Sequence, residues 1–352
     1  MEWLVYLLVG TYTAAGSEGL YAYRFDEERG TAEYVSAAKV ENPSYLTVTE
    51  NGGKTCVYAV SENDEATSCL NMFTFDKAKG TFACIRSEKT EGGAPCYVVT
   101  DEACRLAVTA NYGGGSLSIF PLSADGTPGK LSQLLRFEGR GSVKGRQDSP
   151  HLHCAAFSPE GKYLFATDLG TDRLYRFAVE RIADSAYVRE DSRQEYRTAD
   201  GAGPRHFTFH PSGKFMYLVN ELGGTVTAYA YADGVLQALE TLVCDSLHAG
   251  GSADIHLSPD GRFLYASNRL QGDGLSCFAV DGQTGRLRPV GYRPTVRHPR
   301  NFAFTPNGRF LLVAGRDDDC IQIFRVDPTD GSLHPTGNDL TVSRPVCLKF
   351  VR

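Results

Sequence analysis

Arginine and glutamate side chains stand at spacings that could bring them together in the folded chain. Arg205 and Glu221 are sixteen residues apart, and Asn268 and Arg269 follow a mostly apolar stretch. Guanidinium groups bind carboxylate or phosphate oxygens in pairs, and a carboxylate can serve as a general base. These residue types could therefore hold a small anionic ligand and activate water for attack on an ester.

Further candidates flank two other apolar stretches; they are His151, His153, Asp168, His298, Arg300 and Arg316. Some candidates also have a structural interpretation. Arg205 and Glu221 could form only a structural clamp, and Asp168-Leu-Gly-Thr-Asp172 is also typical of an Asx turn. One of His151 and His153 is expected to be a scaffold group, and the sequence leaves open which one.

Two other histidines, His206 and His210, are expected to be packing or turn residues, because they lie in the opposite register to Arg205. No H-E-x-x-H or cysteine-pair motif is present. A divalent ion at His151, His153 and Asp168 is a weak alternative. We therefore predict that the protein uses neither a metal nor another cofactor.

The elements that must position these residues are set by a repeat. Residues 204–229 (PRHFTFHPSGKFMYLVNELGGTVTAY) have the pattern strand, tight turn, strand, tight turn, strand. Related copies begin about 46 to 55 residues apart, close to the spacing of four-stranded propeller blades. The seven starts are Pro43, Pro95, Pro150, Pro204, Ser252, Pro299 and Pro345.

The last copy stops after one strand, and the N-terminus offers the missing ones at 3–10, 20–25 and 32–38. Pairing the two chain ends in one blade would remove the free edges. The sequence thus predicts an all-β, seven-bladed β-propeller forming a single domain over 1–352. Residues 138–148 are expected to be a lid or a disordered strip, and residues 180–197 an insertion at the outer edge.

Antiparallel pairing predicts which candidates are neighbours. The start of the first strand of a blade and the end of its second lie at the same end of that blade. Arg205 should therefore lie near Glu221, and the other candidates should pair in the same way. If first strands line the central channel, all these groups converge on one mouth. The expected neighbours are His151 and His153 with Asp168, Ser252 with Asn268 and Arg269, and His298 and Arg300 with Arg316.

Composition excludes several classes of partner. The formal net charge is −6, which gives no support for a nucleic-acid-binding face. No apolar run approaches the roughly 20 residues of a membrane-spanning helix. The ten cysteines are scattered, which favours a reducing cytoplasm. We expect a monomer or a weak homo-oligomer that takes a small molecule as its partner.

Across the whole length, the chain resembles the seven-bladed lactonase family, which includes bacterial 6-phosphogluconolactonases and the fungal carboxy-muconate cyclase. The resemblance implies an active site with a histidine, two arginines and a glutamate, here His151 or His153, Arg205, Arg269 and Glu221. The motifs that carry it are Val9–Thr13 with Gly19–Tyr21, Asn42–Leu46, Asn111–Gly115, Pro150–His153, Asp168–Asp172, Gly203–His206, Asn220–Glu221, Ser267–Arg269 and His298–Asn301.

The function expected first is hydrolysis of a sugar lactone, 6-phosphogluconolactone to 6-phosphogluconate in the pentose phosphate pathway. Glu221 or a channel histidine would be the base, while Arg205 and Arg269 would hold the oxyanion and the carboxylate product. The sequence contains no G-x-S-x-G motif, so it does not suggest a covalent nucleophile. Expected substrate-binding residues are Asn268, His298, Arg300 and Asp168. The alternatives are another lactone, a muconate-type cyclisation run in either direction, or a non-enzymatic interaction platform.

Overall fold

A computed structural model describes residues 5–14, 16–182 and 185–352. Its regular structure is almost wholly β, with one short 3-10 helix, η1 (Arg316–Asp318), in the described ranges. None of the helices described is long and apolar enough to cross a membrane. The chain divides into two compact units, residues 1–17, 22–35 and 205–352, and residues 18–21 and 36–204. A single domain over 1–352 stays a prediction.

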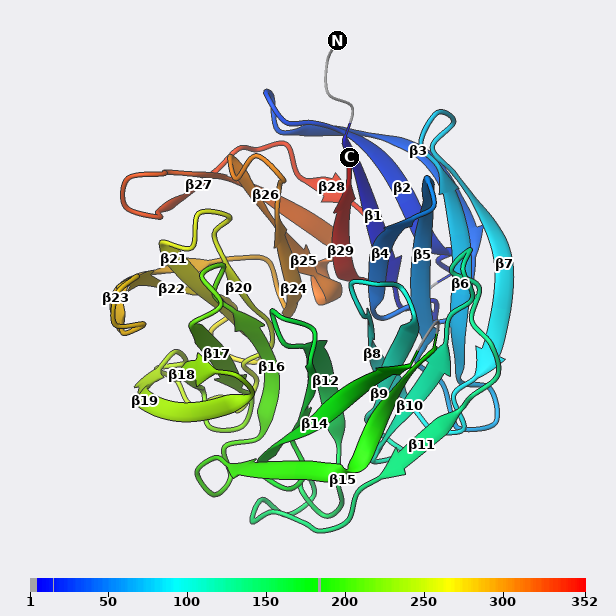
Figure 1. The fold of residues 1–352 in the computed structure, drawn as a ribbon. Helices are drawn as coiled ribbons and strands as arrows, with labels where there is room; N and C mark the ends of the chain where they lie inside the picture. The colour runs from blue at the N-terminus through cyan, green and yellow to red at the C-terminus, as the bar shows by residue number, and fades with distance from the viewer. Residues whose placement is uncertain (1–4, 15, 183–184) are drawn as a thin grey trace. The chain divides into compact units, whose positions relative to one another are not determined.

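The second unit contains three antiparallel sheets of four strands each, in which the strands are hydrogen-bonded neighbours in chain order (Figure 1). Their bounds are β4 (Leu46–Asn51), β5 (Lys54–Ser61), β6 (Cys69–Asp76) and β7 (Thr81–Lys89); β8 (Pro95–Thr100), β9 (Leu106–Asn111), β10 (Ser116–Pro121) and β11 (Gln133–Arg136); and β12 (Leu152–Phe157), β13 (Tyr163–Asp168), β14 (Arg173–Ile182) and β15 (Ser185–Arg197).

The remaining sheets belong wholly or mainly to the first unit. Three of them are β16 (Pro204–Phe209), β17 (Phe215–Asn220), β18 (Thr225–Ala232) and β19 (Val235–Val243); β20 (Ile255–Leu257), β21 (Phe263–Asn268), β22 (Gly274–Val280) and β23 (Leu287–Pro294); and β24 (Pro299–Phe304), β25 (Phe310–Gly315), β26 (Cys320–Val326), β27 (Leu333–Pro335) and β28 (Leu340–Thr341). The closing sheet has the order β29 (Pro345–Val351), β1 (Val5–Thr11), β2 (Gly19–Asp26) and β3 (Thr31–Lys39).

The predicted fold class is confirmed: seven sheets form the blades of an all-β propeller, and the two chain ends pair in one blade. β1 and β29 run antiparallel, with Tyr6 opposite Val351 and Gly10 opposite Cys347. The strand predicted at 3–10 matches β1, except that residues 3 and 4 lie outside the described ranges. The apolar residues of β1 are buried, as expected for a strand with neighbours on both edges.

The sixteen-residue spacing found in the sequence is the register between the first and second strands of a blade. Leu152 pairs with Asp168 and Pro299 with Gly315. A register shift follows in each case, so that His153 and Arg300 are extra residues in a β-bulge. Bulges redirect side chains and often lie beside functional sites.

This register corrects one alignment made from the sequence. The repeat predicts Pro150 as the start of the fourth copy, but Leu152 is the residue that occupies the place of Pro299. His153 therefore corresponds to Arg300. The strand bounds of β16 and β17 place Arg205 at the same position. Proline marks the start of five other copies, so the sequence favours Pro150, although the distance to the following turn places Leu152 there.

Neighbouring blades are joined by a repeated tyrosine contact. The hydroxyl of Tyr217 in β17 donates to the carbonyl of Gly285, in the turn before β23 of the next blade, at 3.0 Å. Tyr265 and Gly331 repeat the contact between the next two blades at 2.5 Å. In the second unit, Tyr58 donates to Gly126 at 2.6 Å. Each tyrosine thus satisfies its buried hydroxyl while its ring packs between sheets.

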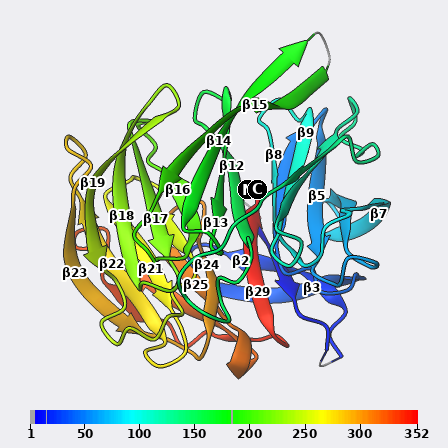
Figure 2. The same ribbon diagram turned by 90° about the horizontal axis from the view of Figure 1, so that it is seen from below.

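Two segments differ from expectation. Residues 138–148 are ordered and anchored, not a loose strip: Gln147 is fully buried and donates to the carbonyl of Leu169 and to Asp172 Oδ1 at 2.8 and 2.7 Å. Residues 180–197 are mostly the regular outer strand β15, which pairs with β14. Figure 2 shows this long hairpin projecting beyond β8 and β9. Through these hydrogen bonds the buried Gln147 side chain anchors a loop that is polar in composition.

We expect Gly285→Ala to lower the free energy of unfolding by about 2 kcal/mol or more. Gly285 has φ +71°, and an added Cβ would lie 2.3 Å from the ring of Phe215. Gly282, in the same turn, has open space around its Cβ position, so Gly282→Ala should change stability by less than about 0.5 kcal/mol. Urea unfolding of both variants measures the difference, and equal effects would contradict the packing argument.

Candidate active site

The first unit brings Arg205, Glu221 and Arg269 together as predicted. Glu221 Oε2 lies 2.8 Å from Arg205 Nε and 3.2 Å from Arg269 Nη2. The three residues come from the start of β16, the end of β17 and the end of β21, so the sixteen-residue register creates the cluster. They are only 1%, 6% and 6% exposed. One carboxylate thus neutralises part of the charge of two buried guanidinium groups.

Backbone carbonyls accept further hydrogen bonds from both arginines. Arg205 Nη1 donates to the carbonyl of Ala253 at 2.6 Å, and Arg269 Nε donates to the carbonyl of Gly251 at 2.8 Å. Burial lowers the pKa of Arg269 to about 9; the positive charges of Arg205, Arg300 and Arg316 act in the same direction, against Glu221. Arg269 therefore remains charged at pH 7 and can stabilise a developing oxyanion.

The cluster continues from Arg269 to His298 and Arg316, as the expected pairing of their strands requires. Arg269 Nη1 lies 3.3 Å from His298 Nε2, and Arg316 Nη2 lies 3.2 Å from His298 Nδ1. Arg316 is paired with Asp317 through two contacts of 2.6 and 3.0 Å. Cationic and neutral or anionic groups therefore alternate along this end of the first unit.

His298 is held neutral in a strained backbone conformation. Burial lowers its pKa to about 3, assisted by the charges of Arg269 and Arg316 and opposed by Asp317. Its φ of +58° lies in the left-handed region, which is uncommon outside glycine and clusters at functional positions. A neutral imidazole has one acceptor nitrogen, so His298 accepts from one arginine at a time.

The other predicted ligand-binding residues of this unit differ in accessibility. Arg300 is half-buried, at a bulge, with its guanidinium 5.6 Å from the ring centre of Tyr12. Asn268 is fully buried, and its amide bonds to Ser252, Ser276 and the carbonyl of Cys244. The structure thus places Arg300 where a ligand could reach it, while the Asn268 amide bonds to its own sheet and to Cys244, which follows β19 of the preceding one. A role for Asn268 in binding a ligand stays a prediction.

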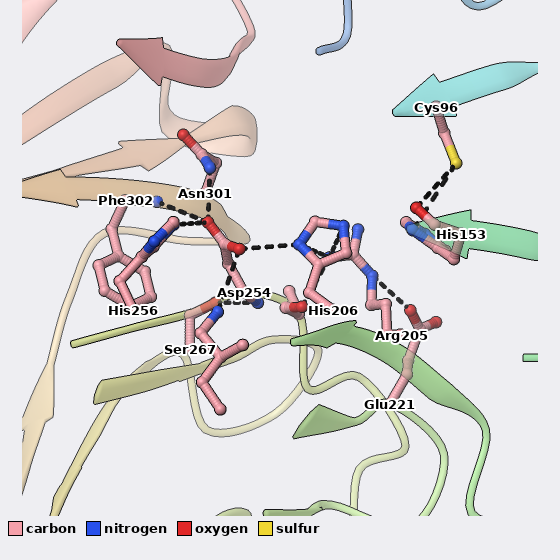
Figure 3. Close-up of polar contacts among 12 residues, drawn as sticks. Cys96, His153, Arg205, His206, Glu221, Asp254, His256, Ser267, Asn301 and Phe302 are labelled. Carbon is pink, nitrogen blue, oxygen red and sulfur yellow. Dashed lines mark hydrogen bonds and ion pairs between the residues drawn. The ribbon is translucent and has the colours of Figure 1, made fainter. Parts of the chain in front are cut away.

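Sequence reasoning missed a polar cluster directly behind Arg205. Asp254 is buried and accepts from His206 Nδ1 at 2.8 Å, His256 Nε2 at 2.9 Å and Asn301 Nδ2 at 2.5 Å (Figure 3). His206, Asp254 and Asn301 stand at the same position of three successive copies: His206 and Asn301 lie within β16 and β24, and Asp254 lies just before β20. This recurrence of polar residues at one position is a signal present in the sequence.

Burial and the neighbouring groups together set the charges within this cluster. Burial lowers the pKa of His206 to about 3, and the neighbouring Arg205 adds to the effect. Burial alone would favour protonated Asp254, but His256 and His206 outweigh it and hold the pKa of Asp254 well below its usual value. His206 is therefore neutral and Asp254 ionised at pH 7. The expectation that His206 merely packs is incomplete, whereas His210 does lie in a turn, bonded to Ser212.

In the second unit, the two candidate histidines have different surroundings. His151 is half-buried and stacks on Tyr112 with ring centres 4.2 Å apart, and its Nδ1 lies 2.8 Å from the carbonyl of Tyr112. His153 is buried, with Nδ1 3.6 Å from Cys96 Sγ. If His151 Nδ1 donates to that carbonyl, its Nε2 is left as the basic nitrogen.

Asp168 has the surroundings of a turn residue. It accepts from the backbone nitrogens of His151 and Gly170 at 2.7 and 3.0 Å and from Thr171 Oγ1 at 2.7 Å. Burial raises its pKa, although these hydrogen bonds act in the opposite direction. Its proximity to His151 is as predicted, and the Asx-turn interpretation accounts for all three contacts. A role for Asp168 in binding a ligand stays a prediction.

A metal site and a cavity are two other kinds of candidate site besides the charged cluster. In the ranges that the structure describes, no group of three or more His, Cys, Asp or Glu side chains is arranged to hold a metal ion. A cavity of about 760 Å³ lies between β22, β23 and the turn before β27, and it contains none of the predicted residues. We place the candidate site at the cluster because ionisable groups converge there while buried.

Acidification should destabilise the protein through His206. Its pKa is about 3 when folded and about 6.5 when unfolded, so only the unfolded chain takes up this proton between those values. The stability that His206 contributes above pH 6.5 is therefore lost as pH falls, by about 1.4 kcal/mol for each pH unit. Unfolding free energies from pH 7.5 to 5 should fall faster for the wild type than for His206→Gln, and parallel curves would refute this.

Removing the carboxylate of Glu221 should be costly. Glu221→Gln leaves two buried guanidinium groups without their shared anion, so we expect a loss of about 3 kcal/mol in the free energy of unfolding. Glu28→Gln is the matched control, because Glu28 pairs with Arg309 at an exposed site and should contribute less than about 1 kcal/mol. Similar unfolding midpoints for the two variants would show that Glu221 is not needed to hold the arginines.

Comparison with known proteins agrees with this architecture. Residues 6–350 match the family described as lactonase, 7-bladed beta-propeller. A relative from Formosa agariphila named 6-phosphogluconolactonase is 36% identical over 344 residues, which cover 96% of this chain and 97% of the relative.

Two solved structures extend the likeness to the fold in detail. A crystal structure of a candidate 6-phosphogluconolactonase from Bacteroides fragilis has a TM-score of 0.95 and 46% identity, covering 99% of this chain and 98% of that one. The periplasmic gluconolactonase of Pseudomonas aeruginosa has a TM-score of 0.90 and 35% identity, covering 99% of both chains. The family resemblance read from the motifs is confirmed, and the chain belongs to the lactonase family of seven-bladed β-propellers.

Proposed function

We propose that this protein hydrolyses a sugar lactone at the Arg205–Glu221–Arg269 cluster, with 6-phosphogluconolactone as the first substrate to test. The observation that carries the proposal is the pair of buried guanidinium groups held by one carboxylate in a lactonase-family chain. Preorganised cations in a buried site stabilise an oxyanion more strongly than the same groups in water. The name of the Formosa relative supports the choice of substrate.

The reaction needs water, a base and an oxyanion site. A base takes a proton from water as the oxygen attacks the lactone carbonyl, and the carbonyl oxygen becomes an oxyanion that Arg205 and Arg269 stabilise. The bond from the carbonyl carbon to the ring oxygen then breaks, and the ring oxygen takes up a proton. Within the first unit, Glu221 is the candidate base. The alternative base expected from the sequence, His151 or His153, stays a prediction.

The phosphate would be bound by groups at the accessible end of the cluster. Arg300 and Arg316 are half-buried and lie near His298, so they could form charge-assisted hydrogen bonds to phosphate oxygens. An unphosphorylated lactone is the second candidate, because the Pseudomonas protein is a gluconolactonase. The two sugars, assayed side by side, separate these candidates. An inert protein that captures a stable partner would instead favour the interaction platform.

Location and assembly belong to the same proposal. We propose a cytoplasmic monomer or weak homo-oligomer, and none of the ten cysteines, all of them in the described ranges, forms a disulfide. A reducing compartment suits such a chain. The periplasmic location of the Pseudomonas protein makes fractionation of cells a direct check on this point.

Arg269→Ala should lower kcat for lactone opening by about 10²- to 10³-fold, because it removes a donor that acts on the oxyanion. Arg286→Ala is the control: Arg286 forms an exposed ion pair with Glu240 and should leave kcat within about twofold. Initial rates must be corrected for spontaneous opening. Wild-type protein that fails to exceed the spontaneous rate would refute the function, and a fully active Arg269→Ala variant would refute the site alone.

A further inference from the structure

Arg205 rests against the ring of His206. Its Nη1 atom lies 3.3 Å from His206 Nε2 and 3.5 Å from Nδ1. An atom almost equally distant from both ring nitrogens lies over the face of an imidazole, because an in-plane partner of one nitrogen is much farther from the other. The contact therefore places one end of the guanidinium, Nη1, over the face of the imidazole, and it is attractive while the ring is neutral.

Asp254 fixes the orientation of that ring. His206 Nδ1 lies 2.8 Å from Asp254 Oδ1, and the same oxygen accepts from the backbone nitrogen of Ile255 at 3.0 Å. The other oxygen, Oδ2, accepts from His256 Nε2, Asn301 Nδ2 and the backbone nitrogen of Phe302. A carboxylate with five donors around it has little freedom, so the imidazole that it holds has little freedom either.

The same chain of contacts joins three blades of the first unit to the closing blade. Asn301 Oδ1 accepts from the backbone nitrogen of Leu348 at 2.7 Å, which ties the cluster to β29 of the closing sheet. Arg205 is thus held by Glu221 through Nε, by the carbonyl of Ala253 through Nη1, and by the face of His206. Glu221 and Ala253 thus hold Arg205 through Nε and Nη1, and the ring of His206 lies against Nη1.

We propose that Asp254 and His206 are positioning residues for the lactone-opening site: Asp254 orients the His206 ring, and this ring fixes the Arg205 guanidinium for contact with the oxyanion. The inference rests on the proposed function. A displacement of about 1 Å in a catalytic group can cost about 10²-fold in rate. Loss of either residue should therefore lower kcat much more than it raises KM, because the oxyanion forms only in the transition state.

A matched pair of variants separates positioning from stability. His206 and His256 each donate to Asp254, but only His206 has a contact with Arg205 among the hydrogen bonds described here. His206→Gln should lower kcat by about 10²-fold, while His256→Gln should stay within about threefold of the wild type. Asp254→Asn should match His206→Gln. Because Asp254 is so densely bonded, Asp254→Asn could fail to fold, and His206→Gln then decides the question.

A double-mutant cycle and a spectroscopic signal complete the test. In an Arg205→Lys background, His206→Gln should cause no further loss of kcat, because its effect passes through Arg205. The Arg205 Nε–H signal in nitrogen-15 NMR should be protected from exchange in the wild type and in His256→Gln, and lose protection in His206→Gln. Equal losses of kcat in the two histidine variants, or an unchanged Arg205 signal in His206→Gln, would overturn the proposal. If wild-type protein opens no lactone, the proposed function fails, and the Arg205 signal still decides whether His206 positions Arg205.

Discussion

Two buried positive charges share one negative charge, and the arrangement of the first unit follows from that constraint. Arg205 and Arg269 repel each other, and removing either from water carries a large cost unless an anion and hydrogen-bond acceptors replace the lost solvent. Glu221 Oε2 lies between them, and the backbone carbonyls of Ala253 and Gly251 accept further hydrogen bonds from the two arginines. The paired strands of each blade must therefore keep a fixed register, because a slip of one residue would turn these side chains to the opposite face of the sheet.

The same constraint explains why the neighbouring histidines are neutral. A second layer of positive charge beside the arginines would be unfavourable, and burial reinforces that effect for both His206 and His298. Asp254 and Asp317 each accompany one of these histidines and offset part of the cationic field. The site is thus rich in positive charge, and nearby carboxylates compensate part of it. The remaining positive charge can stabilise an anionic substrate or transition state.

The sequence allowed most of the fold to be predicted, because the turn residues, the apolar strands and the sixteen-residue spacing are local signals that repeat. The proximity of Arg205 to Glu221 and of His298 to Arg316 followed from that spacing alone. What it could not supply were bulges and long-range polar contacts: the place of His153, the anchoring of Gln147, and the Asp254 cluster all depend on pairings across strands or loops. Asn268 illustrates the limit, since its side chain could equally have faced a ligand or its own sheet.

The pairing of β1 with β29 has a consequence for how the protein is made. β1 lies more than 300 residues before β29 in the chain, so their hydrogen bonds cannot form until β29 has been synthesised. At about 5 to 20 residues per second, the emerging polypeptide carries a bare strand edge for roughly 20 to 70 seconds. During that interval β1 is open to pairing with a strand of another nascent chain, so a host that makes this protein quickly has good reason to keep chaperones at the tunnel exit.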